Sequence, residues 1–156
     1  VMMSFIYQIR ELQNGGEFVV LLFLAAWGND TLAYCTGMLI GKHKMSPILS
    51  PKKSIEGLVG GIVGAAILGA LYVLYLNTYI RFSFNPVTMF PIVCGLSGAV
   101  SVIGDLAASA IKRDSGIKDY GTLIPGHGGI LDRFDSIIFI APVIYYLTVM
   151  ISGGAI

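Results

Sequence analysis

Residues 55–80 read "IEGLVGGIVGAAILGALYVLYLNTYI" and indicate the architecture of the chain. After Glu56 this stretch contains no charged residue, and it exceeds the roughly 20 apolar residues that a helix needs to cross a bilayer. Gly57 and Gly61, and likewise Gly60 and Gly64, form overlapping GxxxG pairs, a spacing that lets two helix backbones approach closely in lipid. We therefore predict a membrane-spanning helix with a glycine face for packing.

Three other stretches are long and apolar enough to span a membrane, namely residues 17–41, about 87–111 and about 134–153. The composition agrees, because 55% of the residues are hydrophobic and only 12% are charged, against roughly 25% charged in soluble domains. The runs also lack the alternation of membrane β-strands. We predict an all-α fold, a polytopic integral membrane bundle of about four transmembrane helices.

The basic residues gather on one side of these four spans. The connections 42–54 and 112–133 hold eight of them: Lys42, Lys44, Lys52, Lys53, Lys112, Arg113, Lys118 and Arg133. The opposite side holds two, Arg10 and Arg81. Because basic loops stay in the cytoplasm, we predict that loops 42–54 and 112–133 face it. The net charge of +1 gives no reason to expect a nucleic acid as a partner.

Cys35 and Cys94 lie in apolar stretches without the spacing of metal ligands, which predicts that both are buried free thiols. The chain opens at Val1 without a signal-peptide pattern. We expect residues 1–156 to form a single transmembrane domain, the later part of a longer chain.

Polar residues interrupt the first span and follow it. Asp30 lies inside the span, where an unpaired carboxylate costs several kcal/mol, so it either belongs to a site or pairs with a basic residue. Downstream, "KHKMSPILSPKKS" (residues 42–54) carries four lysines and two prolines. These lysines are typical either of a loop resting on anionic lipid headgroups or of a phosphate clamp.

A second group of polar residues lies in "GDLAASAIKRDSGIKDYGTLIPGHGGILDRFDS", residues 104–136. Asp105, Ser109 and Lys112 are spaced i, i+4 and i+7, so they share one face of a helix. Asp132 and Asp135 share a face at the start of the last span. A helix N-cap explains one of these two aspartates but not both.

The loop before the last span has features of an anion site. Gly128 and Gly129 allow the backbone to approach a ligand closely and present amide groups to it. Carboxylates beside phosphate-binding groups indicate Mg²⁺, whereas one histidine without a nearby thiolate argues against zinc. His127 is compatible with a general base, a phosphate hydrogen-bonder or a residue that only structures the loop.

Residues 109–135 resemble the signature of the phosphatidate cytidylyltransferases, or CDP-diacylglycerol synthases, without a departure across 27 positions. The matching residues are Ser109, Lys112–Arg113, Lys118–Asp119, Ile124–Pro125, His127–Gly128–Gly129, Asp132–Arg133 and Asp135. The stretch "NDTLAYCTGMLIGKHK…SPKKSIEG", which begins at Asn29, is similar to a second recurring region of the family.

The resemblance implies a membrane nucleotidyltransferase of phospholipid biosynthesis that makes CDP-diacylglycerol and pyrophosphate from CTP and phosphatidate with Mg²⁺. It implies a multi-pass protein of the bacterial inner membrane with its active site facing the cytoplasm. Residues 1–156 would be its single transmembrane catalytic domain, the C-terminal part of the longer chain. It favours the phosphate-clamp interpretation of Lys52 and Lys53, and it leaves room for a second cation and for a homo-oligomer.

From the chemistry of the reaction that the resemblance implies, we predict three groups of site residues. The metal ligands are Asp105 and Asp132, with Asp135 as a third candidate. The phosphate and substrate contacts are Lys52, Lys53, Ser109, Lys112, Arg113, Gly128, Gly129 and Arg133, with Asp30 either among them or paired elsewhere. The catalytic set is Asp105, Asp132, Lys112 and His127.

Two alternatives remain at this point. One is a CTP-dependent lipid or polyprenol kinase, which transfers the γ-phosphate. The other is an ion-coupled transporter, in which Asp30 and Asp105 line an ion pathway.

Overall fold

The computed structural model describes residues 2–46, 50–76, 85–117 and 131–151. In chain order its elements are α1 (Ser4–Glu11), α2 (Gly15–Phe23), the π-helical turn η1 (Leu24–Gly28), α3 (Asn29–Ile40), β1 (Lys44–Ser46), β2 (Ser50–Ser54), α4 (Ile55–Leu76), α5 (Pro86–Asp114) and α6 (Leu131–Ile151). This confirms an all-α bundle, with one short β-hairpin as its departure from helix.

Three of the helical segments are long and apolar enough to cross a membrane: Gly15–Ile40, Ile55–Leu76 and Pro86–Asp114. The predicted fourth span corresponds to α6, whose apolar part, Phe134–Met150, is shorter. The predicted ends at residues 80 and 153 lie outside the described residues.

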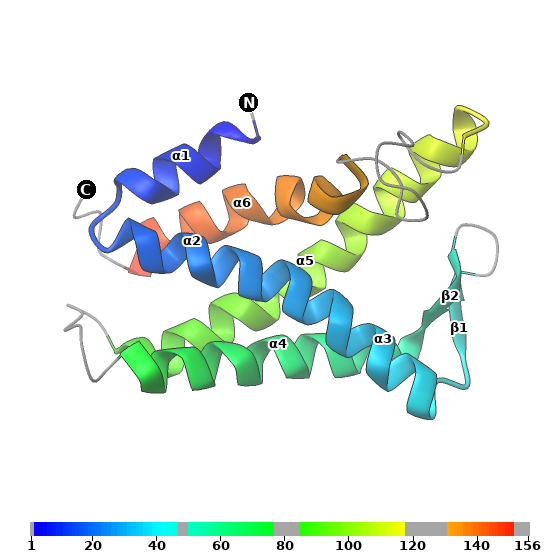
Figure 1. Cartoon of the computed structure of the whole chain (residues 1–156), viewed down its shortest axis with the longest axis horizontal. Helices are drawn as coiled ribbons and strands as arrows, with labels where there is room; N and C mark the ends of the chain where they lie inside the picture. Colours follow the sequence, from blue (N-terminus) through cyan, green and yellow to red (C-terminus); the bar gives the residue numbers. More distant parts are fainter. Residues whose placement is uncertain (1, 47–49, 77–84, 118–130, 152–156) are drawn as a thin grey trace.

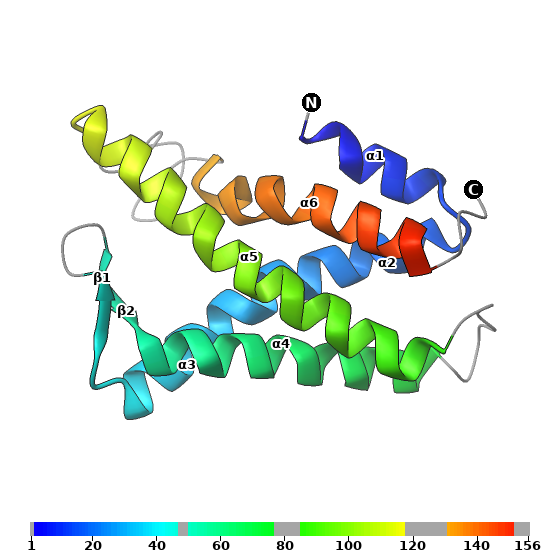
Figure 2. The ribbon, with the colours of Figure 1, turned by 180° about the vertical axis from the view of Figure 1, so that it is seen from behind.

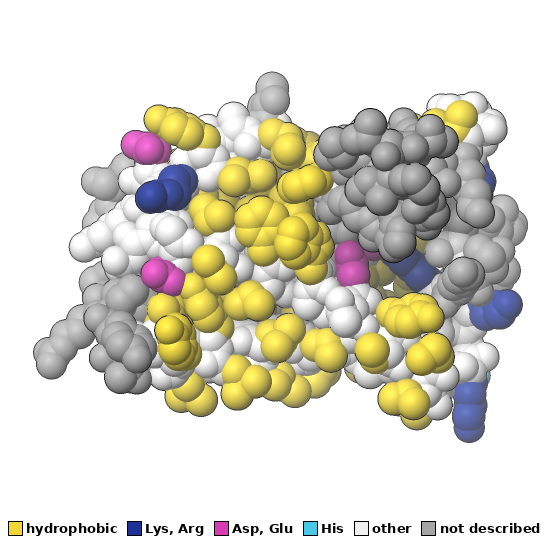
Figure 3. All heavy atoms as spheres, viewed as in Figure 1, with side chains coloured by type: hydrophobic (Ala, Val, Ile, Leu, Met, Phe, Trp, Pro, Cys, Tyr) yellow, Lys and Arg dark blue, Asp and Glu magenta, His cyan; other side chains and the backbone are white. Residues whose placement is uncertain are grey.

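The helices pack as a bundle around α5. The segments α2, η1 and α3 follow one another as a continuous rod that crosses α4 (Figure 1). Seen from behind, α5 runs diagonally and packs against both α4 and α6 (Figure 2). The short helix α1 lies on α6, where the rings of Phe5 and Tyr145 are 5.4 Å apart. Hydrophobic side chains cover much of the face in Figure 3, as expected of helices that contact lipid.

The contact between α3 and α4 depends on the glycine face. A Cβ atom at Gly61 would lie 2.8 Å from Ala33 Cβ and 2.8 Å from Asn29 Oδ1, and one at Gly57 would lie 2.7 Å from the carbonyl oxygen of Ala33. Because no side chain separates the two helices here, their backbones approach closely, which confirms the predicted role of the GxxxG pairs.

The ends of α5 follow from local sequence. At its start, Asn85 is the N-cap, and its Oδ1 accepts a hydrogen bond from Val87 N over 3.2 Å. Pro86 takes the first helical position. At its end, Gly116 adopts a left-handed φ of 68°, and Ile117 N donates to Lys112 O over 2.9 Å. This Schellman-type end lies beyond Arg113, so α5 includes the first residues of the predicted loop 112–133. Helix α6 begins at Leu131 and includes the last residues of that loop.

Two further expectations are corrected. Residues 42–54 are not only a loop, because β1 and β2 pair antiparallel there, with Lys44 opposite Ser54 and Ser46 opposite Ser50. A single Pro51 at the short β2 edge does not prevent pairing. Cys94 is buried as predicted, but Cys35 is exposed on the outward face of α3.

We predict that Gly61→Ala destabilises the protein although alanine is the better helix former. The added methyl group would lie within 3.0 Å of Ala33 Cβ and of the side-chain and backbone oxygens of Asn29. We therefore expect the free energy of unfolding to fall by about 1–3 kcal/mol. Thermal unfolding in detergent measures it. The control is Gly16→Ala, since nothing lies within 4 Å of a Cβ there; equal melting temperatures for the two variants would contradict the packing.

Candidate functional site

Asp105 on α5 carries the central carboxylate of the site. Lys53 Nζ, from β2, donates to Asp105 Oδ2 over 2.7 Å, and Ser136 Oγ, from α6, donates to Asp105 Oδ1 over 2.5 Å. The Asp105 side chain is 15% exposed and that of Lys53 31%. Asp105 lies nine residues before the end of α5, roughly 13 Å along the helix axis. An acid at such a depth needs partners of this kind.

Two more carboxylates converge on the same hydroxyl group. Asp30 Oδ2 lies 3.4 Å and Asp135 Oδ1 3.5 Å from Ser136 Oγ, and Ser136 is only 3% exposed. Ser136 N also donates to Asp135 Oδ1 over 2.8 Å. Since one hydroxyl proton serves one acceptor at a time, its short bond goes to Asp105. Carboxylates from α3, α5 and α6 therefore meet around one buried side chain.

A second contact joins α5 to α6 nearer the C-terminal end of α5. Lys112 Nζ lies 3.9 Å from Asp135 Oδ2, and the Lys112 side chain is only 12% exposed. Asp105 and Lys112 thus both face the start of α6, as the i, i+7 spacing predicted. Ser109 is half-buried between them along the helix, and Arg113 is exposed near its end.

The π-helical turn η1 places Asp30. This turn, Leu24–Gly28, adds a wider ring to the rod directly before Asn29 and Asp30. A π-turn rotates the residues that follow it relative to a regular helix, and such turns are frequent at functional sites. Asn29 is fully buried against α4 and α5, and Asp30 turns toward Ser136.

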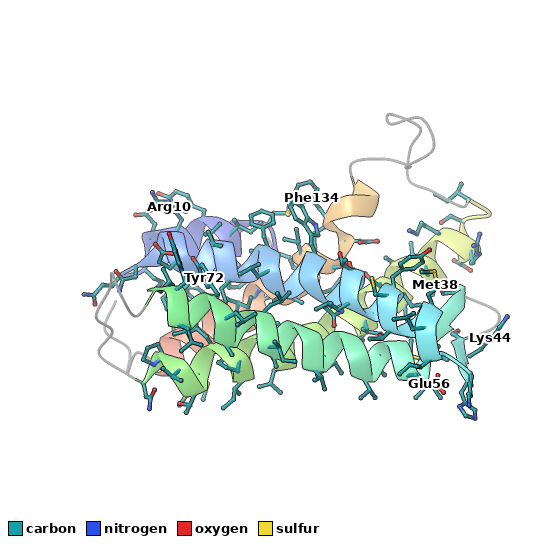
Figure 4. The ribbon with its side chains drawn as sticks, turned by 60° about the horizontal axis from the view of Figure 1, so that its bottom comes forward. Arg10, Met38, Lys44, Glu56, Tyr72 and Phe134 are labelled. Atoms are coloured by element: carbon teal, nitrogen blue, oxygen red, sulfur yellow. The ribbon has the colours of Figure 1, made fainter. Side chains whose placement is uncertain are left out.

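A pocket of about 320 Å³ opens beside these groups. Its charged lining consists of Asp30, Lys53 and Asp105, and its larger apolar residues are Tyr34, Met38, Met45, Leu58 and Val102. Figure 3 shows acidic and basic side chains meeting at a hollow bordered by hydrophobic ones. Met38 lies near the hairpin end of the bundle (Figure 4). The pocket can therefore receive a molecule that has both a charged and an apolar part.

The donor chemistry fits a hard divalent cation. Three carboxylates against two lysine ammonium groups leave a formal charge of −1 among the described side chains around Ser136, and carboxylate oxygens are the ligands that Mg²⁺ prefers. Within the described residues, no group of three or more His, Cys, Asp or Glu side chains is arranged as a ready metal cage. Both Asp105 oxygens are engaged by Lys53 and Ser136.

The profile of the cytidylyltransferase family matches residues 1–151, nearly the whole chain. The chain belongs to the cytidylyltransferase family. Among its relatives is the phosphatidate cytidylyltransferase of Staphylococcus saprophyticus, 37% identical over 148 residues, which are 95% of this chain and 55% of that protein. The enzyme of the same name from Staphylococcus aureus is 40% identical over 145 residues, 93% of this chain and 53% of that protein. The chain spans about half the length of these relatives.

The side chains of several residues predicted for the site are not described. His127, Gly128 and Gly129 lie outside the described residues, and the described side chains do not include those of Lys52, Asp132 and Arg133. The structure brings Asp30, Lys53, Asp105, Lys112 and Asp135 together. The assignment of metal ligands and phosphate contacts stays a prediction.

Sequence reasoning missed Ser136. It directly follows Asp135, the last residue of the matched signature, and a serine at the head of an apolar helix is unremarkable by composition. Its position beside two aspartates on the inner side of that helix is the only signal that the sequence offers. Its importance appears only once α3, α5 and α6 are placed together.

The Lys53–Asp105 ion pair predicts strong coupling between two substitutions. Lys53→Met leaves Asp105 without its cation, and since the pair is only partly buried we expect the free energy of unfolding to fall by about 1–3 kcal/mol. In Lys53→Met/Asp105→Asn the charge is gone, and much of that loss should be recovered. Thermal unfolding of the parent, both single variants and the double variant measures the coupling; additivity within about 0.5 kcal/mol contradicts the pairing.

Proposed function

We propose that the protein transfers the cytidylyl group of CTP to phosphatidate, forming CDP-diacylglycerol and pyrophosphate. The observation that carries the proposal is the similarity to relatives named phosphatidate cytidylyltransferase over more than nine-tenths of this chain. The site supports it, because a charged cluster beside a pocket with an apolar wall suits a lipid phosphate and a nucleotide.

The reaction joins two anions. A phosphate oxygen of phosphatidate bonds to the α-phosphorus of CTP, and the bond from that phosphorus to the bridging oxygen of the β-phosphate breaks, releasing pyrophosphate. Catalysis of such a transfer is mainly positioning and neutralisation of charge. Lys53 and Lys112 supply positive charge at the described part of the site. Lys52, Arg113 and Arg133 are proposed to add phosphate contacts.

Mg²⁺ is the proposed cofactor, held by Asp105 and Asp132, with Asp135 as the third ligand. When bound, it neutralises phosphate charge and polarises the phosphorus centre. The hydrogen bonds of the site orient the carboxylate of Asp105, because Ser136 donates to one of its oxygens and Lys53 to the other. Lys53 is then able to exchange its carboxylate partner for a phosphate of the substrate, as lysine ammonium groups bind both.

The charge distribution supports an active site that faces the cytoplasm of a bacterial inner membrane. Lys44 lies at the hairpin end of the bundle and Arg10 at the opposite end (Figure 4). Lys42, Lys53, Lys112 and Arg113 belong to the segments at the hairpin end. Basic residues concentrate on the cytoplasmic side of membrane proteins, where CTP is available, while phosphatidate arrives from the bilayer. A homo-oligomer stays a prediction.

Two labels on CTP test the proposal. With purified protein, phosphatidate vesicles and Mg²⁺, we expect a label on the cytidine to enter the lipid and a label on the γ-phosphate to leave as pyrophosphate. A γ-label found in the lipid would instead support the kinase. As the control, Asp105→Asn stays folded in detergent but loses activity by roughly 10²-fold or more; near-normal turnover in that variant removes Asp105 from the site.

A further inference from the structure

We propose that His43 and Glu56 form a clasp that holds the β-hairpin on α4 and so positions Lys53 over Asp105. The proposal rests on the proposed function, in which Lys53 meets a phosphate of the substrate. Neither residue belongs to the set that the sequence assigned to the site. Both would act through the hairpin rather than through contact with the substrate, since neither lines the pocket.

The clasp is a set of contacts on one carboxylate. His43 N donates to Glu56 Oε1 and to Oε2, each over 3.2 Å, and His43 Nδ1 lies 2.6 Å from Glu56 Oε1. In return, Ile55 N donates to His43 O over 2.9 Å. The residue that precedes β1 is therefore bound on both of its sides to the first turn of α4.

The hairpin needs such an anchor because its own ladder is short. β1 has 3 residues and β2 has 5, and their register is irregular between Lys44 and Ser46. A two-stranded hairpin is at best marginally stable alone. The end of β2 is fixed separately, where Gly57 N donates to Ser54 Oγ over 3.1 Å. With the clasp, both strands are tied to the start of α4.

The position of Lys53 depends on this anchor of the hairpin. Lys53 lies three residues before Glu56, on the strand that leads directly into α4, and it reaches Asp105 with a bond of 2.7 Å. Such a bond weakens when its atoms move by a few tenths of an ångström, and ordering a lysine side chain costs much conformational entropy. A loosened hairpin therefore releases Lys53, even though every residue of the pocket is still present.

The exposure of the pair distinguishes positioning from general stability. The side chain of His43 is 75% exposed and that of Glu56 23%, and exposed ion pairs contribute little to global stability. Figure 4 shows Glu56 at the hairpin end, with Lys44 extending away from the bundle. Loss of the clasp should therefore alter the position of the hairpin far more than the melting temperature.

The test follows the hairpin directly. Spin labels at Ser46 in β1 and Ile111 in α5 report the hairpin's distance from α5, in a Cys35→Ser background because that cysteine is exposed. In nanodiscs, Glu56→Ala removes the three contacts to the Glu56 carboxylate and leaves the backbone bond from Ile55 N to His43 O, so the distance distribution should broaden. His43→Ala keeps the two backbone contacts and should broaden it less.

Activity gives the second readout. Without the spin labels, we expect Glu56→Ala to raise KM for CTP about tenfold with a smaller change in kcat, because hydrogen bonds to a charged group are lost and Lys53 is no longer held for the phosphate. Glu56→Gln, which keeps an acceptor for the backbone of His43, should recover part of the effect. The control, Glu11→Ala, removes an exposed acid of α1 and should change neither readout.

The outcomes separate this proposal from the proposed function. A distance distribution as narrow in Glu56→Ala as in the parent overturns the clasp. A broadened distribution with an unchanged KM overturns the role of the clasp in positioning Lys53. If the parent makes no CDP-lipid while Glu56→Ala still frees the hairpin, the proposed function fails and the hold of the clasp on the hairpin is supported.

Discussion

The site depends on the cost of keeping the carboxylate of Asp105 inside an apolar bundle. An ionised group there must be paired and hydrogen-bonded, and Asp105 receives one bond from Lys53 and another from Ser136. These partners come from β2 and α6, segments on opposite sides of α5 in the sequence. One partly buried charge thus connects the hairpin, α6 and α5 to one another.

Close packing makes this arrangement reachable. The glycines of α4 let α3 approach it without intervening side chains, and the π-helical turn sets the direction of Asp30 on the same rod. Lipid supplies no hydrophobic driving force between helices, so such close contacts and internal hydrogen bonds hold the bundle together. Close helix packing therefore brings the carboxylates together, and the lysines stabilise their negative charge.

Much of the fold was predictable, because an uninterrupted apolar run such as residues 55–76 has few alternatives to a membrane helix. The shared face of Asp105 and Lys112 followed from helical periodicity. The hairpin did not, since its two short strands are stabilised by tertiary anchors rather than by a period-2 pattern. Ser136 was not predictable either, because its role appears only where α3, α5 and α6 meet. Asp132, the predicted partner of Asp105 at a metal ion, stays a prediction because its side chain is not among those described.

Anomalous scattering from crystals soaked with Mn²⁺ in place of Mg²⁺ tests whether Asp105 and the aspartates at the start of α6 share a metal ion. We expect one strong peak at about 2.1 Å from a carboxylate oxygen of Asp105 and from one of Asp132 or Asp135. A peak elsewhere, or carboxylates of Asp105 and the two α6 aspartates that point away from one another with no shared ion, would contradict this expectation.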